Sequence, residues 1–261
     1  MSVPYKHDRI VLLGKDGPST RIIYHALKKE FSEISVILEG KVSNTQLLKR
    51  RVSKLGMRTV FGQVMFMSII MPFLRYTGKK RVEEINQKYD LDDSPIRDLI
   101  INVSSVNSNE ARQALQHSNP KLVVVNGTRI IGEKTLSCVN ATFINTHAGI
   151  TPIFRGVHGG YWALVEGQPD LVGTTVHVVD KGIDTGNIIA QAKFEVSTTD
   201  SFVTYPYLHT AVAVPILINA IRSILSNTLE LQSISSNATS KLWSHPTLWG
   251  YIGKWFLKGI K

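Results

Sequence analysis

The chain has 261 residues, 43% of them hydrophobic, so it is long enough to bury one substantial core, and we expect one main domain with a small C-terminal appendage. Its 30 Lys and Arg residues outnumber its 20 Asp and Glu residues, which gives a formal net charge of +10. This balance favours an anionic partner, such as a phosphate, a nucleotide, a polycarboxylate cofactor, RNA or an acidic membrane face, although a merely soluble basic surface fits as well. The single cysteine, Cys138, excludes an intramolecular disulfide and a cysteine-based metal site.

Two stretches bear on targeting and on membranes. Residues 1–8 contain no apolar core, so we predict no signal peptide. The longest apolar run, residues 60–74, includes Gly62, Gln63 and Pro72 and is shorter than the roughly 20 residues that span a bilayer. We therefore predict a buried helix there.

The chain opens with a strand, a turn and a helix. Residues 9–14 form an apolar run ending in glycine, and Ser19 or Thr20 is predicted to cap a helix over residues 21–30. Backbone amides of residues 15–20 could hold a phosphate, but the spacing matches neither the dinucleotide fingerprint nor the P-loop, and we favour a plain turn.

Residues 44–88 show an irregular helical pattern. Near its start an apolar stripe opposes a basic one, formed by Lys49, Arg50, Arg51 and Lys54. We interpret this basic face as an ordinary solvated surface, with an acidic ligand as the alternative.

The rest of the chain alternates apolar strands with helices. Strands are expected at residues 34–38, 98–103, 121–125, 141–145, 172–179 and 187–194, and helices at residues 108–117, 132–136, 159–167 and 207–225. Such alternation predicts an α/β protein with a mostly parallel sheet flanked by helices.

The polar pair Asn145 and His147 closes one of these runs. The two lie two positions apart, so in a strand both side chains project the same way, and the glycine-rich loop that follows can fold over whatever they face. With Asp184 downstream, the set suggests acid-base chemistry at an acyl carbon without a covalent intermediate. A lone Asn-x-His is more often structural, and we expect His158, His177 and His209 to be packing or surface residues.

Three longer runs are more specific than the Asn-x-His pair alone. They are, in this order along the chain, residues 143–156, 173–177 and 184–191. Together they resemble the formyltransferases that use 10-formyltetrahydrofolate, a family that includes glycinamide ribonucleotide, methionyl-tRNA and sugar N-formyltransferases. The resemblance is close over about residues 95–195. It departs in the loop after the histidine, where residues 149–152 read Gly-Ile-Thr-Pro and family members usually have Ser-Leu-Leu-Pro.

The resemblance implies a doubly wound α/β fold, a cytoplasmic enzyme and no metal. It implies a catalytic domain over residues 1–200, followed by a C-terminal helix and tail at 201–261. The family's catalytic residues fall on Asn145, His147 and Asp184, with Asn145 and a protonated His147 stabilising the oxyanion and Asp184 tuning the histidine. The formyl donor, 10-formyltetrahydrofolate, is expected to lie against Arg129, Ile131, Val179, Asp180 and Ile183.

The acceptor amine is chosen by elimination. Methionyl-tRNA enzymes usually carry a C-terminal β-barrel and the purine enzyme a glycine- and serine-rich phosphate loop, and neither pattern is seen in this sequence. We therefore predict a nucleotide-linked amino sugar, as in the O-antigen of lipopolysaccharide, and no specific nucleic acid. The alternatives are a methionyl-tRNA or glycinamide ribonucleotide formyltransferase, a formyltetrahydrofolate hydrolase, and a binding module with a vestigial site.

The C-terminal tail concentrates apolar rings among lysines. It contains Trp243, Trp249, Tyr251, Trp255, Phe256 and Leu257. Such a patch is seldom left exposed, so we predict that most of these rings are covered, by the domain itself or by a second subunit of a homodimer. A membrane-surface helix is the alternative, and we do not expect a membrane contact.

Overall fold

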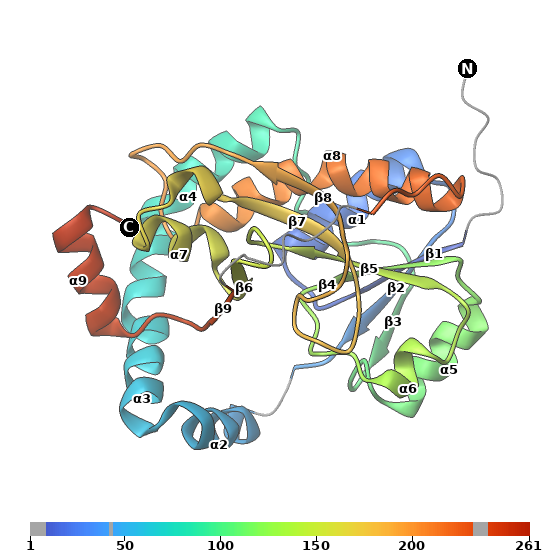
Figure 1. Ribbon diagram of the computed structural model, residues 1–261, viewed down its shortest axis with the longest axis horizontal. Helices are drawn as coiled ribbons and strands as arrows, with labels where there is room; N and C mark the ends of the chain where they lie inside the picture. The colour runs from blue at the N-terminus through green and yellow to red at the C-terminus, as the bar shows by residue number, and fades with distance from the viewer. Residues whose placement is uncertain (1–8, 42–43, 232–239) are drawn as a thin grey trace.

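The protein is described here as a computed structural model of residues 9–41, 44–231 and 240–261, in which one sheet lies between layers of helices (Figure 1). Residues 1–8, for which we predicted no signal peptide, lie outside this description. The sheet has seven strands in the order β3-β2-β1-β4-β5-β7-β8. They are β1 (Ile10–Gly14), β2 (Ile34–Glu39), β3 (Ile100–Val103), β4 (Leu122–Asn126), β5 (Thr142–His147), β7 (Gly173–Val178) and β8 (Ile188–Lys193).

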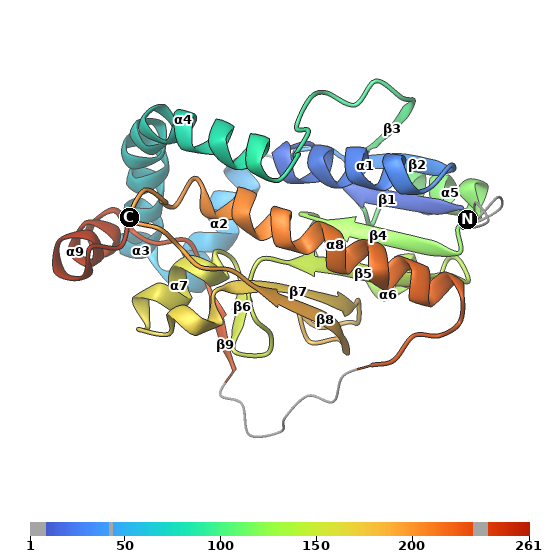
Figure 2. The ribbon, with the colours of Figure 1, turned by 90° about the horizontal axis from the view of Figure 1, so that it is seen from above.

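The first five strands of this order are parallel, and β7 and β8 are added antiparallel at one edge. The helices are α1 (Pro18–Glu30), α2 (Asn44–Leu55), α3 (Met57–Met65), α4 (Met71–Lys88), α5 (Asn109–Ser118), α6 (Glu133–Leu136), α7 (Gly159–Val165), α8 (Tyr205–Leu225) and α9 (Leu248–Lys258). Helices α1 and α8 cover one face of the sheet, and α5 and α6 lie on the other side (Figures 1 and 2). The predicted doubly wound, mostly parallel sheet with a helical, tryptophan-rich C-terminal region is confirmed.

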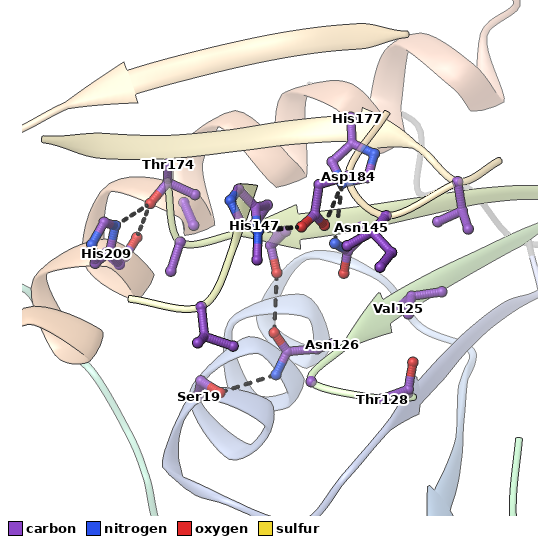
Figure 3. Close-up of a pocket in the computed structure, with 18 of the residues that line it drawn as sticks. Ser19, Val125, Asn126, Thr128, Asn145, His147, Thr174, His177, Asp184 and His209 are labelled. Carbon is purple, nitrogen blue, oxygen red and sulfur yellow. Dashed lines mark hydrogen bonds and ion pairs between the residues drawn. The ribbon is translucent and has the colours of Figure 1, made fainter. Parts of the chain in front are cut away.

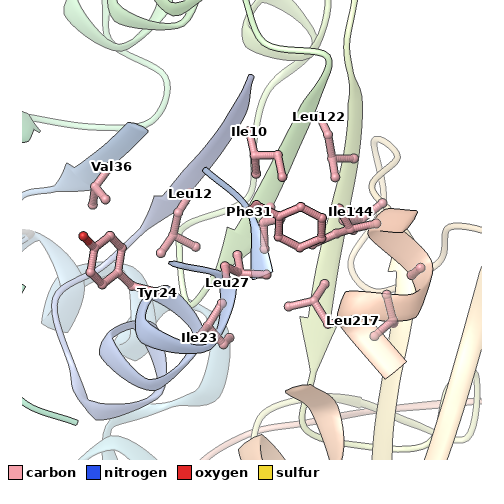
Figure 4. Close-up of a cluster of buried hydrophobic side chains, with 14 of the residues drawn as sticks. Ile10, Leu12, Ile23, Tyr24, Leu27, Phe31, Val36, Leu122, Ile144 and Leu217 are labelled. Atoms are coloured by element: carbon pink, nitrogen blue, oxygen red, sulfur yellow. The ribbon is translucent and has the colours of Figure 1, made fainter. Parts of the chain in front are cut away.

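The core explains the unbroken apolar runs of the central strands. Ile10 and Leu12 of β1 pack with α1 and α8 on one face (Figure 4), while Val11 and Leu13 pack with α5 on the other. Because both faces of the sheet are covered, no position in these strands needs to be polar.

The start of α1 differs from the prediction. The helix begins at Pro18, so Ser19 and Thr20 lie inside its first turn and neither caps it. Proline suits this position because its ring presets the helical φ angle and the missing N–H has no partner there anyway. The two hydroxyls instead bind the side chain of Asn126 on β4.

Residues 44–88 form α2 and then one long helical run, in which a π-helical turn (Phe66–Ile70) joins α3 to α4. Both Met57–Lys88 and Tyr205–Leu225 are long and apolar enough to cross a membrane by length and composition, a test that core helices of soluble proteins also pass. The prediction of a buried helix at residues 60–74 holds for one face only. Val60, Phe66 and Leu74 are buried, whereas Phe61 and Phe73 are exposed.

The C-terminal tail packs against the same chain. A short strand, β9 (Lys241–Trp243), pairs in parallel with β6 (Phe154–Gly156), and α9 contacts α3 and the π-helical turn. Its residue Trp249 lies so close to Gly62 that a Cβ there would be 2.5 Å from the indole ring. Three of the five aromatic rings, those of Trp243, Tyr251 and Trp255, are at least partly covered, as predicted, while those of Trp249 and Phe256 are exposed. The division at residue 200 and the homodimer stay predictions.

Replacing Tyr251 by Ala should lower the free energy of unfolding by about 3 kcal/mol, because large-to-small changes in a packed core lose both transfer energy and packing. The Tyr251 ring is fully buried, with its centroid 4.9 Å from that of Phe66 and 6.1 Å from that of Phe202. Urea denaturation measures the loss. Phe256→Ala on the same helix is the matched control, since this side chain is 84% exposed and its loss should change stability by less than about 0.5 kcal/mol. Equal effects of the two variants would contradict a packed tail.

Candidate functional site

A cavity of about 510 Å³ opens where β4 and β5 end (Figure 3). In open α/β sheets, ligands bind beyond the carboxyl ends of the strands. Asn145 and His147, both on β5, line this cavity as their spacing predicted, and Asp184 reaches it from the loop between β7 and β8. The structure thus brings the three predicted catalytic residues together.

The carboxylate of Asp184 is shared between two imidazole rings. Its Oδ2 lies 3.3 Å from Nδ1 of His147, and its Oδ1 lies 3.6 Å from Nε2 of His177. The backbone N–H of Gly156 donates to the same Oδ2 at 3.0 Å. This half-buried carboxylate therefore joins β5, β7 and Gly156, which lies beyond the end of β5.

The loop that carries Asp184 is closed by its own side chains. Asp180 Oδ1 accepts hydrogen bonds from the Gly182 N–H at 3.0 Å and from the Thr185 hydroxyl at 2.8 Å, a local pattern typical of aspartate in turns. Asp184 itself has a φ of 52°, in the left-handed region that non-glycine residues enter rarely and aspartate more often than most. The loop is thus shaped to present Asp184 to the cavity.

Both ring nitrogens of His147 face hydrogen-bond acceptors. Nδ1 faces Asp184, and Nε2 lies 2.7 Å from the carbonyl oxygen of Phe154. A neutral imidazole has one donor and satisfies only one of these acceptors, whereas the protonated ring satisfies both. The close approach depends on Gly149, where a Cβ would lie 2.4 Å from the Phe154 oxygen and 2.7 Å from Nε2 of His147.

The pKa values of His147 and Asp184 are both lowered. Burial lowers the pKa of His147 below its ordinary value, against the opposing effects of the Asp184 charge and the Phe154 carbonyl. Burial acts to raise the pKa of Asp184, but the neighbouring His177, the charge of His147 and the Gly156 N–H outweigh it, so this pKa lies below its ordinary value. In the substrate-free protein these shifts favour a neutral His147 beside an ionised Asp184.

His177, which we expected to be a packing or surface residue, is buried but belongs to this site. It lies directly across the sheet from Asn145, and Nδ2 of Asn145 is 3.1 Å from its Nε2. Because Nδ1 of His177 lies 2.9 Å from the Val178 carbonyl and donates to it, Nε2 is left to accept from the amide and to fix its orientation. Only the pairing register of β5 and β7 reveals this contact.

Of the other two histidines, His209 is buried and His158 is half-buried, and both line the cavity. Nδ1 of His209 lies 3.0 Å from the Thr174 hydroxyl, and Nε2 of His158 lies 2.9 Å from Nδ1 of His245. Burial lowers the pKa values of His158 and His209 to about 3, so both rings are neutral near pH 7.

The side chain of Asn126 ties the floor of the cavity together (Figure 3). Its Nδ2 donates to the hydroxyls of Ser19 at 3.0 Å and Thr20 at 2.8 Å, and its Oδ1 accepts from the Thr146 hydroxyl at 3.1 Å. Three elements, α1, β4 and β5, are thereby held in register immediately beneath Asn145 and His147.

All five residues predicted to bind the folate line the same cavity, namely Arg129, Ile131, Val179, Asp180 and Ile183. The Arg129 guanidinium is already engaged by the protein, with Nε 3.0 Å from Glu39 Oε2 and Nη2 donating to the carbonyls of Gly40 and Ser104. These contacts hold the guanidinium in place at the wall, and the folate contacts stay predictions. Among the described residues, no group of three His, Cys, Asp or Glu side chains is placed to hold a metal ion.

The sequence matches the family model for formyl transferases over residues 32–221. The chain belongs to the formyl transferase family. A methionyl-tRNA formyltransferase from Caldanaerobacter subterraneus subsp. tengcongensis is 30% identical over 146 residues, which cover 52% of this chain and 44% of that protein. A phosphoribosylglycinamide formyltransferase from Mycobacterium tuberculosis is 47% identical over 73 residues, covering 28% of this chain and 34% of that protein. The chain thus matches less than half the length of these curated relatives.

Solved structures show the same fold at low sequence identity. A sugar N-formyltransferase from a Shewanella species aligns with a TM-score of 0.55 and 14% identity over 90% of this chain and 77% of that one. An N-formyltransferase from Helicobacter canadensis, in complex with folinic acid and dTDP-3-aminofucose, aligns with a TM-score of 0.55 and 16% identity over 91% and 71%. The sheet and its flanking helices therefore form a formyltransferase fold.

The pKa of His147 predicts a pH dependence of stability. Since the folded-state pKa lies below the ordinary value of 6.5, the unfolded chain binds more protons than the folded chain around that pH, and the stability linked to this residue is present above it and lost as the pH falls below it. His147→Asn removes the titration. The free energy of unfolding of the wild type minus that of the variant, from urea denaturation, should therefore rise between pH 5 and pH 8. A difference that stays constant or falls would show that the pKa of His147 is not lowered.

Proposed function

We propose that the protein transfers a formyl group from 10-formyltetrahydrofolate to the amine of a nucleotide-linked amino sugar. The observation that carries the proposal is the convergence of the Asn145 amide, the His147 imidazole and the Asp184 carboxylate on one cavity of a formyl transferase fold. An amide donor beside a proton-accepting ring suits the attack of an amine on a formyl carbon.

Asn145 is assigned to the formyl oxygen. As the amine adds, this oxygen gains negative charge, and a preorganised N–H donor stabilises such charge more than it stabilises the starting carbonyl. One N–H of the Asn145 amide is directed to His177, which holds the group in place and leaves the second N–H for the oxyanion.

His147 is assigned to proton transfer. Burial favours its neutral form in the substrate-free protein, so we have it act first as the base that takes a proton from the attacking amine, in place of the protonated role predicted from the sequence. The imidazolium then finds acceptors at both nitrogens, Asp184 and the Phe154 carbonyl. It returns the proton to the departing nitrogen of the donor as the carbon–nitrogen bond breaks.

The formyl donor is assigned to the wall made by residues 126–131 and 179–184, which includes the five predicted folate contacts. The folate supplies the formyl group, and these residues bind and orient it. The complex of the Helicobacter canadensis protein with folinic acid supports a tetrahydrofolate-type donor for this fold.

The acceptor is assigned by analogy. The Helicobacter canadensis protein holds dTDP-3-aminofucose, and this favours a nucleotide-linked amino sugar. A role in lipopolysaccharide O-antigen synthesis and a cytoplasmic location stay predictions. The relatives by sequence favour a second candidate, methionyl-tRNA or glycinamide ribonucleotide as the acceptor.

Incubation with 10-formyltetrahydrofolate and a panel of acceptors separates these candidates. We expect one dTDP-, UDP- or GDP-linked amino sugar to gain the mass of one formyl group, and methionyl-tRNA and glycinamide ribonucleotide to react much more slowly. Mass spectrometry of the products measures this. Faster formylation of either alternative acceptor would overturn the sugar assignment, and release of formate without any formylated product would indicate a hydrolase.

Asn145→Ala is the control for the site in the same assay. Loss of an oxyanion donor typically lowers turnover by about 10²–10³-fold, and the variant should still unfold cooperatively in urea. Wild-type turnover in this variant would remove Asn145 from the proposed mechanism.

A further inference from the structure

The net positive charge of the chain comes from one segment. Residues 41–82 contain 10 of the 30 Lys and Arg residues and no Asp or Glu, so the remaining 20 basic residues equal the 20 acidic residues of the rest of the chain. The net charge of +10 is therefore the charge of this segment alone. It includes α2, α3, the π-helical turn and most of α4.

The same segment exposes a stripe of large apolar side chains. We call this the exposed stripe, and its members, with their exposed fractions, are Met57 (75%), Phe61 (58%), Val64 (44%), Ile69 (51%), Phe73 (53%) and Tyr76 (85%). Scattered exposed apolar residues are normal on a protein surface, but a contiguous set on one helix face marks an interaction site.

The π-helical turn keeps the exposed stripe on one face. Successive members are separated by 4, 3, 5, 4 and 3 residues, and the step of five, from Val64 to Ile69, crosses the turn Phe66–Ile70. In a π-helical turn the backbone hydrogen bonds join residues five apart, whereas residues three or four apart are neighbours on the face of an α-helix. The local geometry of the helix therefore matches the spacing of its exposed apolar residues.

The opposite face of this long helix is engaged by the fold. Val60, Phe66, Leu74 and Ile85 are buried, and Gln63 donates to the carbonyl of His245 at 2.8 Å. A helix fixed along one side to its own domain is placed to lie on a surface and not to pass through a bilayer. This arrangement is that of an interfacial amphipathic helix, with apolar residues on one face and cations beside them.

We propose that the exposed stripe and the cations around it dock the protein on an anionic membrane surface. Exposed Lys49, Arg50 and Lys54 on α2 lie near one end of the stripe, and Lys79 and Lys80 lie just beyond the other. Cations at both ends place the charge where anionic headgroups would surround the inserted side chains. We had predicted no membrane contact, since residues 60–74 are too short to span a bilayer and the C-terminal tail was expected to be covered. A helix that lies on the surface needs no spanning length.

Charge favours this occupant over a second copy of the chain. A symmetric dimer through the exposed stripe would bring two segments of the same positive charge together, and like charges facing each other across an interface cost several kcal/mol. An anionic surface instead offers compensating charge to the exposed cations.

The docking face is connected to the catalytic cavity. Helix α2 follows the carboxyl end of β2, and the cavity lies at the carboxyl ends of the neighbouring parallel strands (Figure 2). Gln63 of α3 bonds to His245, which contacts His158 in the cavity wall. Docking would therefore bring the active site close to the membrane, whichever amine it formylates.

Vesicle flotation tests the proposal with two double variants and their matched controls. Phe61→Ser with Phe73→Ser removes apolar members of the exposed stripe, and Lys49→Glu with Arg50→Glu reverses charge on α2. Leu99→Ser changes a side chain that is 87% exposed elsewhere, and Lys134→Glu reverses an exposed cation on α6. The vesicles are phosphatidylcholine alone, or phosphatidylcholine with phosphatidylglycerol.

The wild type should float with the phosphatidylglycerol vesicles and not with the neutral ones, and high salt should release it. Each double variant should partition at least about tenfold more weakly, while both controls behave as the wild type. Equal binding to neutral vesicles, no binding at all, or full binding by either double variant would overturn the proposal. Light scattering tests the alternative of a second copy of the chain. If the wild type is a dimer that binds no vesicles, and Phe61→Ser with Phe73→Ser makes it monomeric, the exposed stripe is a dimer interface and the membrane proposal is wrong.

Discussion

The side chain of Asp184 is only 13% exposed at the centre of the site, and a charge so far removed from water requires partners. Two donors face it, the ring of His147 and the N–H of Gly156, and the ring of His177 lies 3.6 Å away. To supply them, the antiparallel strand β7 must pair with β5 in the observed register, and the loop after β5 must fold back to bring Gly156 within 3.0 Å. Much of the local architecture is therefore the means of surrounding one carboxylate.

This arrangement also suits the different roles that we propose for His147 and Asn145. In the proposed mechanism, His147 alternates between a neutral ring, which burial favours, and a protonated ring, for which both neighbouring acceptors are already in place. Asn145 is oriented by His177, which in turn is fixed by a backbone carbonyl. Asn145 and His147 are thus each held by a neighbouring side chain, which is what preorganised transition-state stabilisation requires.

The sequence predicted what depends on local patterns. Alternating apolar strands and helices gave the sheet, and the two-residue spacing of Asn145 and His147 placed both side chains in one cavity. It missed what depends on contacts between distant segments or on competing local signals. The role of His177 follows from the pairing register of β5 and β7. Helix α1 begins at Pro18, so neither Ser19 nor Thr20 caps it. The two faces of Met57–Lys88 differ in exposure only because the fold covers one of them. The loop at residues 149–152 departs from the usual family sequence, yet Gly149 still leaves room for the contact between His147 and Phe154.

The central claim is that Asp184 acts through His147 as one unit in formyl transfer, and a double-mutant cycle tests it most directly. The values of kcat/KM for formyl transfer to the reactive acceptor are measured for the wild type, Asp184→Asn, His147→Asn and the double variant. Residues that act as a unit are strongly non-additive. The account predicts that the double variant loses about as much activity as His147→Asn alone, whereas losses that multiply would show that Asp184 and His147 act independently and would contradict it.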